Sequence, residues 1–370
     1  MIEYDFVIIG AGIVGCSISY ELSKQSDSIL IIDKNSDVAK GASGAAGAFL
    51  SPLLGKPNEF KDLVNRSLIY STTFYKENFS PYFNNCGTTR IPQNREDESK
   101  FQSYIPFMDF PYTKDEKGYF FKIGSVVDSY NICKSMVENS EQSPSKKFNY
   151  EVKKVVFEDE QWIINDEIKA KNIIFATGSD STLFDQFYLK LRAVWGRRID
   201  ITTSTKITHN FHKACSVSQS KNNKNNKNLV SIGATHHRSI EGVEDIDANK
   251  DELLKKANDI VSLKDVEIVD HHVGARACSV DYFPIVGEII DANKTIAEFP
   301  YMVNGTNVDS KRFTRFKNLY MLNGVGGRGF VMAPYLAKQL VASIMDKKEL
   351  HKAITTDRLF KREVKRQKIV

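Results

Sequence analysis

The residues with the clearest chemical meaning are three glycines near the N-terminus. Gly10, Gly12 and Gly15 form the pattern GxGxxG, placed after an apolar strand-like run and before a helix-like one. The first glycine permits a tight turn, the second lets a phosphate approach the backbone, and the third lets helix and strand pack closely. Unpaired N–H groups at a helix start bind anions. The pattern therefore predicts a site for the pyrophosphate of a dinucleotide.

Asp33 strengthens this interpretation. It ends the next apolar run, Ser28–Asp33, which we expect to be the second strand of a βαβ unit. A carboxylate at this position accepts hydrogen bonds from the ribose hydroxyls of an adenosine and repels a 2′-phosphate. FAD and NAD remain as candidates, and the acid disfavours NADP.

Two later turns favour FAD over NAD. One is Ala176-Thr177-Gly178, and the other is the glycine-rich Gly324–Gly329. The second also matches GxGxxG, but no strand with a terminal acid follows it. We interpret it as a second anion-binding helix start near the same cofactor. A ligand contacted by three distant segments has to be long, as FAD is.

Two arginines are candidates for binding a substrate carboxylate, which a guanidinium fork recognises well. Arg276 lies at the end of an expected strand, and Arg328 lies within the second glycine turn. Each has a plain alternative as a structural arginine paired with an acid or a carbonyl. We interpret His236 and His237 as surface residues.

No metal site is expected. His271 and His272 are neighbours in an expected strand, so their side chains point to opposite faces. The five cysteines are widely spaced and contain no CxxC, which argues against zinc and disulfides and favours a cytoplasmic location.

The elements that position these residues alternate in kind. Helices are expected over 57–78, 125–138, 250–262 and 331–344, where Pro334 is tolerated in the first turn. Strands are expected over 193–203, 228–234, 266–276 and 284–290. The fold class is therefore α/β (mixed α+β), with a Rossmann-like domain and a mainly antiparallel β domain.

The predicted domains are discontinuous. We assign residues 1–80, 145–190 and 315–346 to the cofactor-binding domain, and residues 81–144 and 191–314 to the substrate domain. Residues 347–370 form a basic C-terminal tail.

The chain has 370 residues, with 41% hydrophobic and 26% charged residues, so two packed domains are expected. No apolar run reaches the roughly 20 residues that span a bilayer. The net charge is +5. Residues 347–370 hold nine Lys or Arg and three Asp or Glu, a balance of +6 that leaves −1 for the rest. A basic arm of this kind suits an RNA, although a solubilising terminal helix is an equal alternative.

Several stretches together resemble the superfamily of FAD-dependent amine and D-amino-acid oxidases. They are the N-terminal GAGIVG with Asp33, the turn over 41–47 (GASGAAG), the ATG at 176–178 and the C-terminal GVGGRGF. Within it, the chain is similar to the FAD-dependent C-terminal half of the bifunctional enzymes that make 5-methylaminomethyl-2-thiouridine in tRNA. That likeness rests on the stretches 232–238, 273–287 and 327–329. The stretch 41–52 is equally close to glycine oxidase.

The resemblance implies a domain of glutathione-reductase/D-amino-acid-oxidase type that binds FAD. The cofactor-binding residues it implies, taken with the motifs above, are Gly10, Ala11, Gly12, Ile13, Val14, Gly15, Asp33, Lys34, Ala42, Ser43, Gly47, Val155, Ala176, Thr177, Gly178, Gly326, Gly327, Arg328, Gly329 and Phe330. The glycine turn and the helix start after it would cover the flavin ring. Arg276 and Arg328 would position the substrate carboxylate, and no acid–base residue is required.

The activity expected from this resemblance is oxidation of a C–N bond next to a carboxylate. The leading substrate is 5-carboxymethylaminomethyl-(2-thio)uridine in tRNA, which would become the 5-aminomethyl form with release of glyoxylate. The alternative is a free amino acid such as glycine, sarcosine or a D-amino acid. A flavoprotein that binds RNA without turnover is a third possibility, which the many retained glycines argue against.

Overall fold

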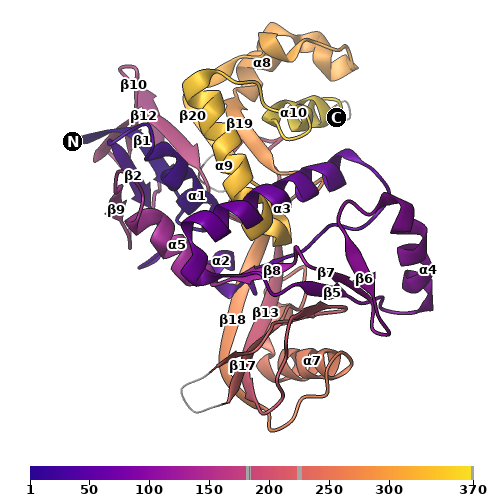
Figure 1. Ribbon diagram of the computed structural model, residues 1–370. Coiled ribbons are helices and arrows are strands. Elements are labelled where there is room, and N and C mark those ends of the chain that lie inside the picture. The colour runs from indigo at the N-terminus through magenta and orange to yellow at the C-terminus, as the bar shows by residue number, and fades with distance from the viewer. Residues whose placement is uncertain (181–182, 184, 223–226, 368–370) are drawn as a thin grey trace.

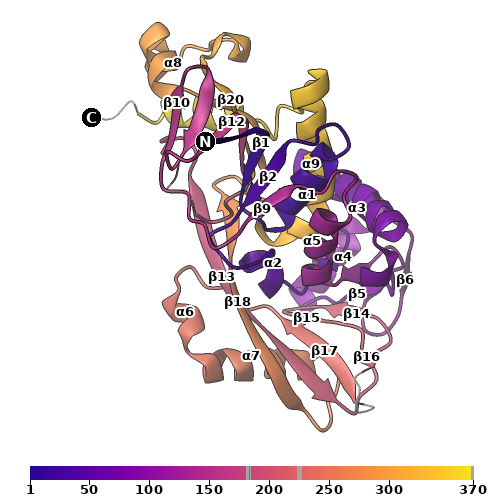
Figure 2. The ribbon, with the colours of Figure 1, turned by 90° about the vertical axis from the view of Figure 1, so that its left-hand side faces the viewer.

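The computed structural model describes residues 1–180, 183, 185–222 and 227–367. Figure 1 shows two parts, one above the other. The upper part holds both ends of the chain, and the lower part is a twisted sheet with a helix against it. The long strands β13 (Leu191–Thr203) and β18 (Glu267–Ser279) run from one part into the other (Figures 1 and 2).

The upper part is built on a parallel sheet in the order β9–β2–β1–β12–β20. Its strands are β1 (Ile2–Ile9), β2 (Ile29–Ile32), β9 (Ser145–Lys147), β12 (Ile168–Phe175) and β20 (Arg315–Asn323). All four residues of β2 are buried. Parallel strands covered on both faces are expected to be apolar without alternation, and the sequence of β2 follows that rule.

Each face of this sheet has its own core. One face packs against α1 (Ile13–Leu22), α3 (Glu59–Asn78), α5 (Ser129–Glu138) and α9 (Gly329–Asp346). The other packs against the hairpin β10 (Val155–Glu158) and β11 (Gln161–Ile164), and against α8 (Ala292–Glu298) and α10 (Thr356–Val364). Successive residues of β1 point to opposite faces of the sheet: Ile8 belongs to the first core and Val7 to the second.

The lower sheet has the order β18–β13–β17–β15–β14–β5–β7–β6. Its further strands are β5 (Thr88–Arg90), β6 (Tyr112–Lys114), β7 (Tyr119–Phe121), β14 (Asn210–His212), β15 (Ser216–Val217), β16 (Lys221–Asn222, paired with β17) and β17 (Asn228–Gly233). Its pairs are antiparallel except β5 with β14, so the prediction of a mainly antiparallel second domain is confirmed. Helix α7 (Ile246–Asn258) packs on it and begins four residues before the expected helix, because Asp245 caps the Ala248 N–H.

The remaining short elements lie in neither of these two sheets. They are α2 (Ala42–Ala45), β3 (Phe49–Leu50), β4 (Phe83–Asn84), α4 (Arg95–Tyr104), β8 (Ser125–Val127) and α6 (Glu241–Glu244). Three elements lie elsewhere than the predicted domain division places them. Strand β19 (Ile285–Ile290) pairs with β20 in the upper sheet, α8 packs on the second core of that sheet, and α5 packs against α1. We therefore keep the division as a proposal, with β19, α8 and α5 moved to the cofactor-binding domain.

Helix α9 contains a proline, and a hydroxyl from helix α3 supplies the hydrogen bond that this proline removes. Pro334 lies in the second turn of α9, not in the first as expected, because the helix begins at Gly329. A proline has no N–H, so the Phe330 carbonyl four residues earlier loses its helical partner. The Tyr75 hydroxyl of α3 donates to that carbonyl at 2.9 Å, and the Ser71 hydroxyl donates to the Val331 carbonyl at 2.7 Å.

The segment expected to be a basic tail contains α10, which belongs to the fold. Leu359 and Phe360 of α10 are fully buried in the second core. Arg358 donates to both carboxylate oxygens of Asp281 at 3.0 and 3.1 Å, and to the Phe283 carbonyl. Partial burial raises the pKa of Asp281, but the bonds from Arg358 outweigh it and hold that pKa below its usual value. Lys368 lies outside the described residues.

None of the helices in the described ranges is long and apolar enough to cross a bilayer.

The hydroxyl of Tyr75 is predicted to stabilise the start of α9. Tyr75→Phe leaves the buried Phe330 carbonyl without a partner, so the free energy of unfolding should fall by about 1–3 kcal/mol. Chemical denaturation followed by circular dichroism, at a fixed excess of FAD, measures this. Tyr335→Phe is the matched control, because the Tyr335 hydroxyl makes no hydrogen bond to any described residue. Equal stability of the two variants would contradict the prediction.

Candidate active site

The N-terminal glycine turn packs so closely against neighbouring backbone that Gly10 and Gly15 leave no room for a side chain. Gly10 has φ +110°, and a Cβ there would lie 2.4 Å from the Ala176 carbonyl oxygen. A Cβ on Gly15 would lie 1.8 Å from the Gly10 carbonyl oxygen. Gly12 precedes the first turn of α1 and gives it no side-chain cap. The amide groups at the start of α1 are therefore presented to whatever lies in front of them.

Asp33 lies where the carboxyl ends of β1 and β2 meet. Its carboxylate accepts from the Ala11 N–H at 2.7 Å, and from both the backbone and side-chain N–H groups of Asn35 at 2.8 Å. Lys34 forms an ion pair with Asp180 at 2.8 Å, and the hydrogen bond to Asp180 raises the pKa of Lys34.

The turn over residues 41–47 is enclosed from two sides. The Ser43 hydroxyl accepts the Ile13 N–H of α1 at 2.9 Å. From the other domain, Arg198 of β13 donates to the Ala46 carbonyl, and a Cβ on Gly274 of β18 would lie 2.7 Å from the Ala42 Cα. This turn therefore lies against residues of both domains.

One cavity of about 770 Å³ joins these segments. Among the residues predicted to bind the cofactor, those lining it are Gly10, Gly12, Ile13, Val14, Asp33, Lys34, Ala42, Ser43, Gly47, Ala176, Thr177, Gly178, Gly326, Gly327, Arg328, Gly329 and Phe330. The predicted substrate residue Arg276 lines it as well. Three far-separated glycine turns therefore surround one space, as a single long ligand requires.

Three of the predicted residues do not line the cavity. Ala11 is buried behind it, where its N–H bonds Asp33, and Gly15 packs against Gly10. The placement of Val155 is corrected: Val155 begins the hairpin strand β10, and Val152 lines the cavity in its stead. The reason is that the Tyr150 N–H donates to the Asp33 carbonyl, which brings the residues just after Tyr150 to the end of β2.

The second glycine turn lies at the other end of the cavity. Gly324 and Gly326 have φ of +73° and +56°, a region that side chains rarely adopt. Residues Gly326–Arg328 form a short turn of helix, and α9 starts at Gly329 without a side-chain cap. The positive end of an 18-residue helix therefore faces the cavity beside Arg328.

The two predicted arginines have no carboxylate partner among the described residues. Arg276 makes only long contacts to the carbonyls of Val194 and Thr235, at 3.5 and 3.4 Å. The Arg328 guanidinium makes no hydrogen bond or ion pair within the described part of the chain, and only the Arg328 backbone N–H donates, to the Val325 carbonyl. Burial lowers the pKa of Arg276, and it lowers the pKa of Arg328 to about 10. Neither arginine is paired with an acid among the described residues, whereas the carbonyl contacts of Arg276 leave the alternative of a structural arginine open for that residue.

Arg90 and His212 are among the residues of the cavity wall that the sequence did not indicate. They are register partners in neighbouring strands β5 and β14. The only sequence signal is an arginine that ends a short Thr-Thr-Arg strand, and that pattern is common on ordinary surfaces. His236 is an exposed residue, as interpreted, and it also lines the cavity, whereas His237 bonds the Asn249 side chain at 3.0 Å.

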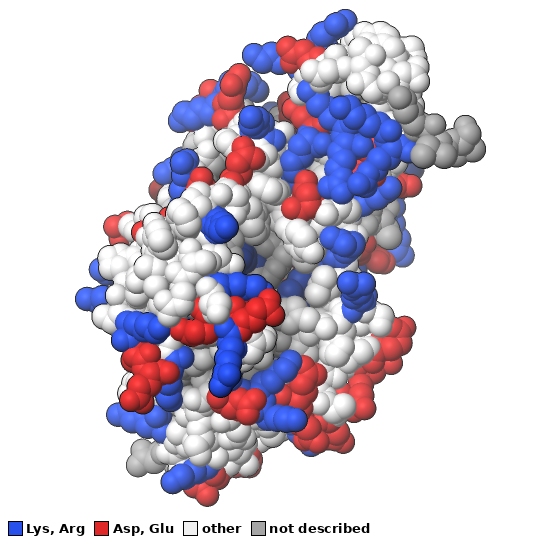
Figure 3. Space-filling model, turned by 90° about the vertical axis from the view of Figure 1, so that its right-hand side faces the viewer, with Lys and Arg blue, Asp and Glu red and all other residues white. Residues whose placement is uncertain are grey.

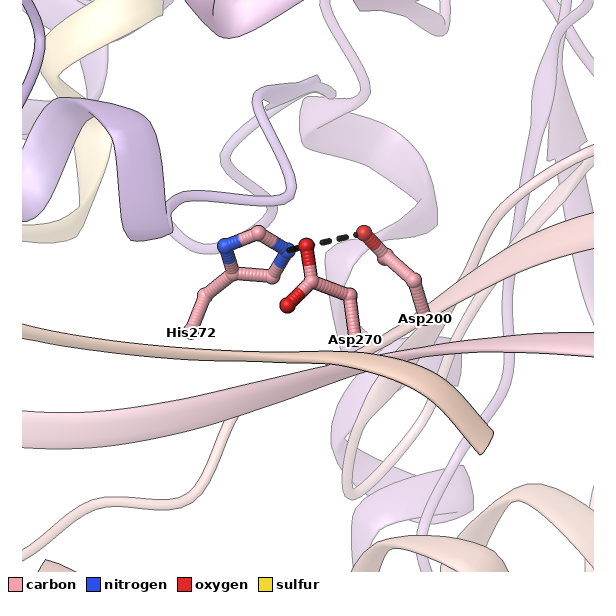
Figure 4. A group of neighbouring side chains, drawn as sticks. All are labelled: Asp200, Asp270 and His272. Atoms are coloured by element: carbon pink, nitrogen blue, oxygen red, sulfur yellow. Dashed lines mark hydrogen bonds and ion pairs between the residues drawn. The ribbon is translucent and has the colours of Figure 1, made fainter.

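A group with metal-like spacing lies outside the cavity. Figure 4 shows Asp200 of β13 with Asp270 and His272 of β18, whose ligand atoms lie within 4.8 Å of one another. The Asp200 carboxylate is already engaged, by Arg198 at 3.0 Å and by His272 at 2.9 Å. The Asp200 carboxylate therefore already binds the Arg198 guanidinium, and we assign no metal site to this group.

The fold and the cavity define a flavoprotein of the oxidoreductase class, and the family comparison agrees. The model of the FAD-dependent oxidoreductase family matches residues 5–343, so the chain belongs to this family and its cofactor is FAD. The residues present suit that group: the starts of α1 and α9 have no cap from their own N-cap side chains and line the cavity, where they would hold the pyrophosphate, and the Asp33 carboxylate at the end of β2 would hold the ribose.

Known relatives carry more specific names. The chain is 25% identical to the tRNA 5-methylaminomethyl-2-thiouridine biosynthesis bifunctional protein MnmC of Legionella pneumophila, and 29% identical to that of Campylobacter jejuni. These alignments cover 98% and 97% of the chain, but only 58% and 59% of the relatives' length. Among solved structures, glycine oxidase from Bacillus cereus has a similar fold, with a TM-score of 0.71 at 17% identity over 94% of this chain and 96% of that one.

The close packing at Gly15 is predicted to be necessary for holding FAD. Gly15→Val forces the side chain into the Gly10 carbonyl and displaces the turn, so most of the bound flavin should be lost. The ratio of flavin to protein absorbance after gel filtration measures this. Cys16→Ala, at the next position of α1, removes atoms without entering that contact and should retain flavin. Full flavin content in Gly15→Val would show that the close approach is dispensable.

Proposed function

We propose that this chain oxidises the C–N bond next to a carboxylate in 5-carboxymethylaminomethyl-(2-thio)uridine of tRNA. The carbon between the nitrogen and the carboxylate loses a hydride, and the nitrogen loses a proton, which leaves an imine. Water then cleaves the imine to give 5-aminomethyl-(2-thio)uridine and glyoxylate. When bound, FAD supplies the hydride acceptor.

One observation carries this proposal: guanidinium groups without carboxylate partners face the cavity at its second glycine turn. Arg276 and Arg328 both line the cavity there, and a Cβ on Gly327 would lie 3.5 Å from Arg276 Cδ. Desolvated guanidinium groups bind carboxylates with paired, charge-assisted hydrogen bonds. A substrate held by its carboxylate at that turn presents the adjacent carbon to the flavin end of the cavity. These residues orient the substrate, and no side chain of the site is assigned as an acid or a base.

The choice of tRNA is supported by the relatives named for tRNA modification, which match nearly the whole chain. A second support is the surface around α10. Lys361 and Arg362 lie on this helix, and Lys365 and Arg366 follow directly after its end. Glu363 lies among them, and Lys190 forms an ion pair with the same Glu363 from outside the helix. Figure 3 shows Lys and Arg side chains gathered beside the C-terminal end of the chain. Clustered cations of this kind bind phosphates.

The second candidate is a free amino acid, and the similarity of the fold to glycine oxidase favours it. Both candidates need the carboxylate site, so the arginines do not separate them. We place the reaction in the cytoplasm, where the five cysteines, all of them free, would stay reduced.

Nucleoside analysis separates the two candidates. Holoenzyme is incubated with tRNA that carries the 5-carboxymethylaminomethyl group, and the nucleosides are then measured by mass spectrometry. We expect loss of that nucleoside, gain of the 5-aminomethyl form and an equal amount of glyoxylate. Reduction of the flavin by glycine or sarcosine, with unchanged tRNA nucleosides, would favour the small-molecule activity instead.

The surface of α10 is predicted to contribute to tRNA affinity. Deleting residues 347–370 would remove Leu359 and Phe360 from the core, so charge reversal on the surface is the cleaner change. Lys361→Glu with Lys365→Glu should weaken tRNA binding and reduce the slope of log K against log salt by roughly 1–2. Lys255→Glu with Lys256→Glu on α7, at the opposite end of the molecule in Figure 1, is the charge-matched control. Identical slopes for the two double variants would exclude α10 from the interface.

A further inference from the structure

Arg90 lines the cavity and has no role in the reaction proposed above. It ends β5, and one of its terminal N–H groups donates to the Pro52 carbonyl at 2.7 Å. Its Nε is shielded from water and has no hydrogen-bond partner among the described residues. A guanidinium has five N–H donors in a fixed fork, so most of the binding capacity of Arg90 is unused in the described structure.

Within the part of the chain that the structure describes, no acid forms an ion pair with Arg90. Burial lowers the pKa of Arg90 to about 10, and the charge of Arg328 acts in the same direction. Asp97 of α4 acts on Arg90 only weakly and from a distance, since its carboxylate accepts the Gln93 N–H and forms no ion pair with Arg90. The acids that line the cavity are Asp33, Glu151 and Asp180, which belong to the segments around the end of β2 and the turn after β12.

His212 does not supply the missing charge either. It lies directly across the strand pair from Arg90, and its Nδ1 is 2.7 Å from the Ser216 hydroxyl. Burial, and then the charges of Arg90 and Arg328 and the nearby His236, hold the pKa of His212 well below its usual value. The wall around Arg90 and Arg328 is therefore made of two cations and a neutral imidazole, an arrangement that an anion between the cations would relieve.

We propose that Arg90 joins Arg276 and Arg328 in the carboxylate site, with Arg90 and Arg328 binding the same carboxylate, and that Arg90 is a specificity-determining residue of the site. This rests on the proposed function, because it adds a group to those that hold the carboxylate the reaction requires. Arg328 approaches from the glycine turn and Arg90 from the sheet of the substrate domain, so the carboxylate is held between the two domains. The hydrogen bond from Arg90 to the Pro52 carbonyl fixes the position of the Arg90 guanidinium.

The test is equilibrium binding of acetate and of its neutral isostere acetamide to the oxidised holoenzyme. The flavin absorbance near ~450 nm reports binding at the ring without turnover. We expect the wild type to bind acetate more tightly than acetamide. Arg90→Gln should weaken acetate binding roughly 10- to 100-fold, the loss expected for hydrogen bonds to a charged group, and leave acetamide binding unchanged. A merely structural role of Arg90 would change both affinities alike.

Two further variants complete the test. Arg192→Gln is the control, since Arg192 is exposed and does not line the cavity, and its preference for acetate should equal that of the wild type. Arg90→Gln combined with Arg328→Gln should lose less than the product of the single losses, because the two arginines share one anion. Should Arg90→Gln fail to fold, Arg90→Lys keeps the charge but not the fork and should show a smaller loss in acetate affinity alone.

The possible outcomes separate this inference from the proposed function. A wild type that binds acetate no better than acetamide would overturn the carboxylate site, and with it the proposed reaction. A wild type that prefers acetate, together with an Arg90→Gln variant that keeps the full preference, would overturn only the role of Arg90.

Discussion

Backbone-to-backbone contact at the carboxyl ends of the parallel strands is the constraint on which the rest of the structure depends. Gly10 lies against the Ala176 carbonyl, and Gly15 lies against Gly10, so two turns far apart in sequence form one continuous floor. The amides of α1 face the cavity only because no side chain separates these segments. The adenosine end follows from the same contact, since the Gly10 N–H donates to the Ile32 carbonyl at 2.8 Å, next to Asp33.

The second domain completes the site by packing against the turn over residues 41–47 of the first domain. Gly274 of β18 allows that strand to approach α2, and Arg198 of β13 bonds the carbonyl of Ala46. Arg198 and Asp200 occupy alternate positions of β13, and the carboxylate neutralises the buried guanidinium. The cofactor cavity and the substrate wall are thus joined by strands that cross from one domain to the other, and a change in either domain is transmitted to the turn over 41–47.

Local patterns were sufficient for the parts of the site that depend on backbone. The GxGxxG turn, Asp33 at a strand end and the glycines before α9 each carry a signature within a few residues, and the structure places all three around one space. Arg90 and His212 carry none, because their role comes from pairing β5 with a strand more than 100 residues away. The shift from Val155 to Val152 has the same origin: a hydrogen bond between Tyr150 and Asp33 decides it, and strand periodicity does not encode it. The sequence shows that Pro334 removes a helical hydrogen bond. It does not show that the hydroxyl which bonds the freed carbonyl comes from α3.

Helix α10 joins two properties that are usually separate in a terminal segment. Its charged side is turned outward, while Leu359, Phe360 and Val364 on its other side close the second core. A chain shortened before residue 356 would therefore expose the sheet beneath it and lose surface charge in the same step. Any phenotype of such a truncation would mix misfolding with weakened attraction to polyanions.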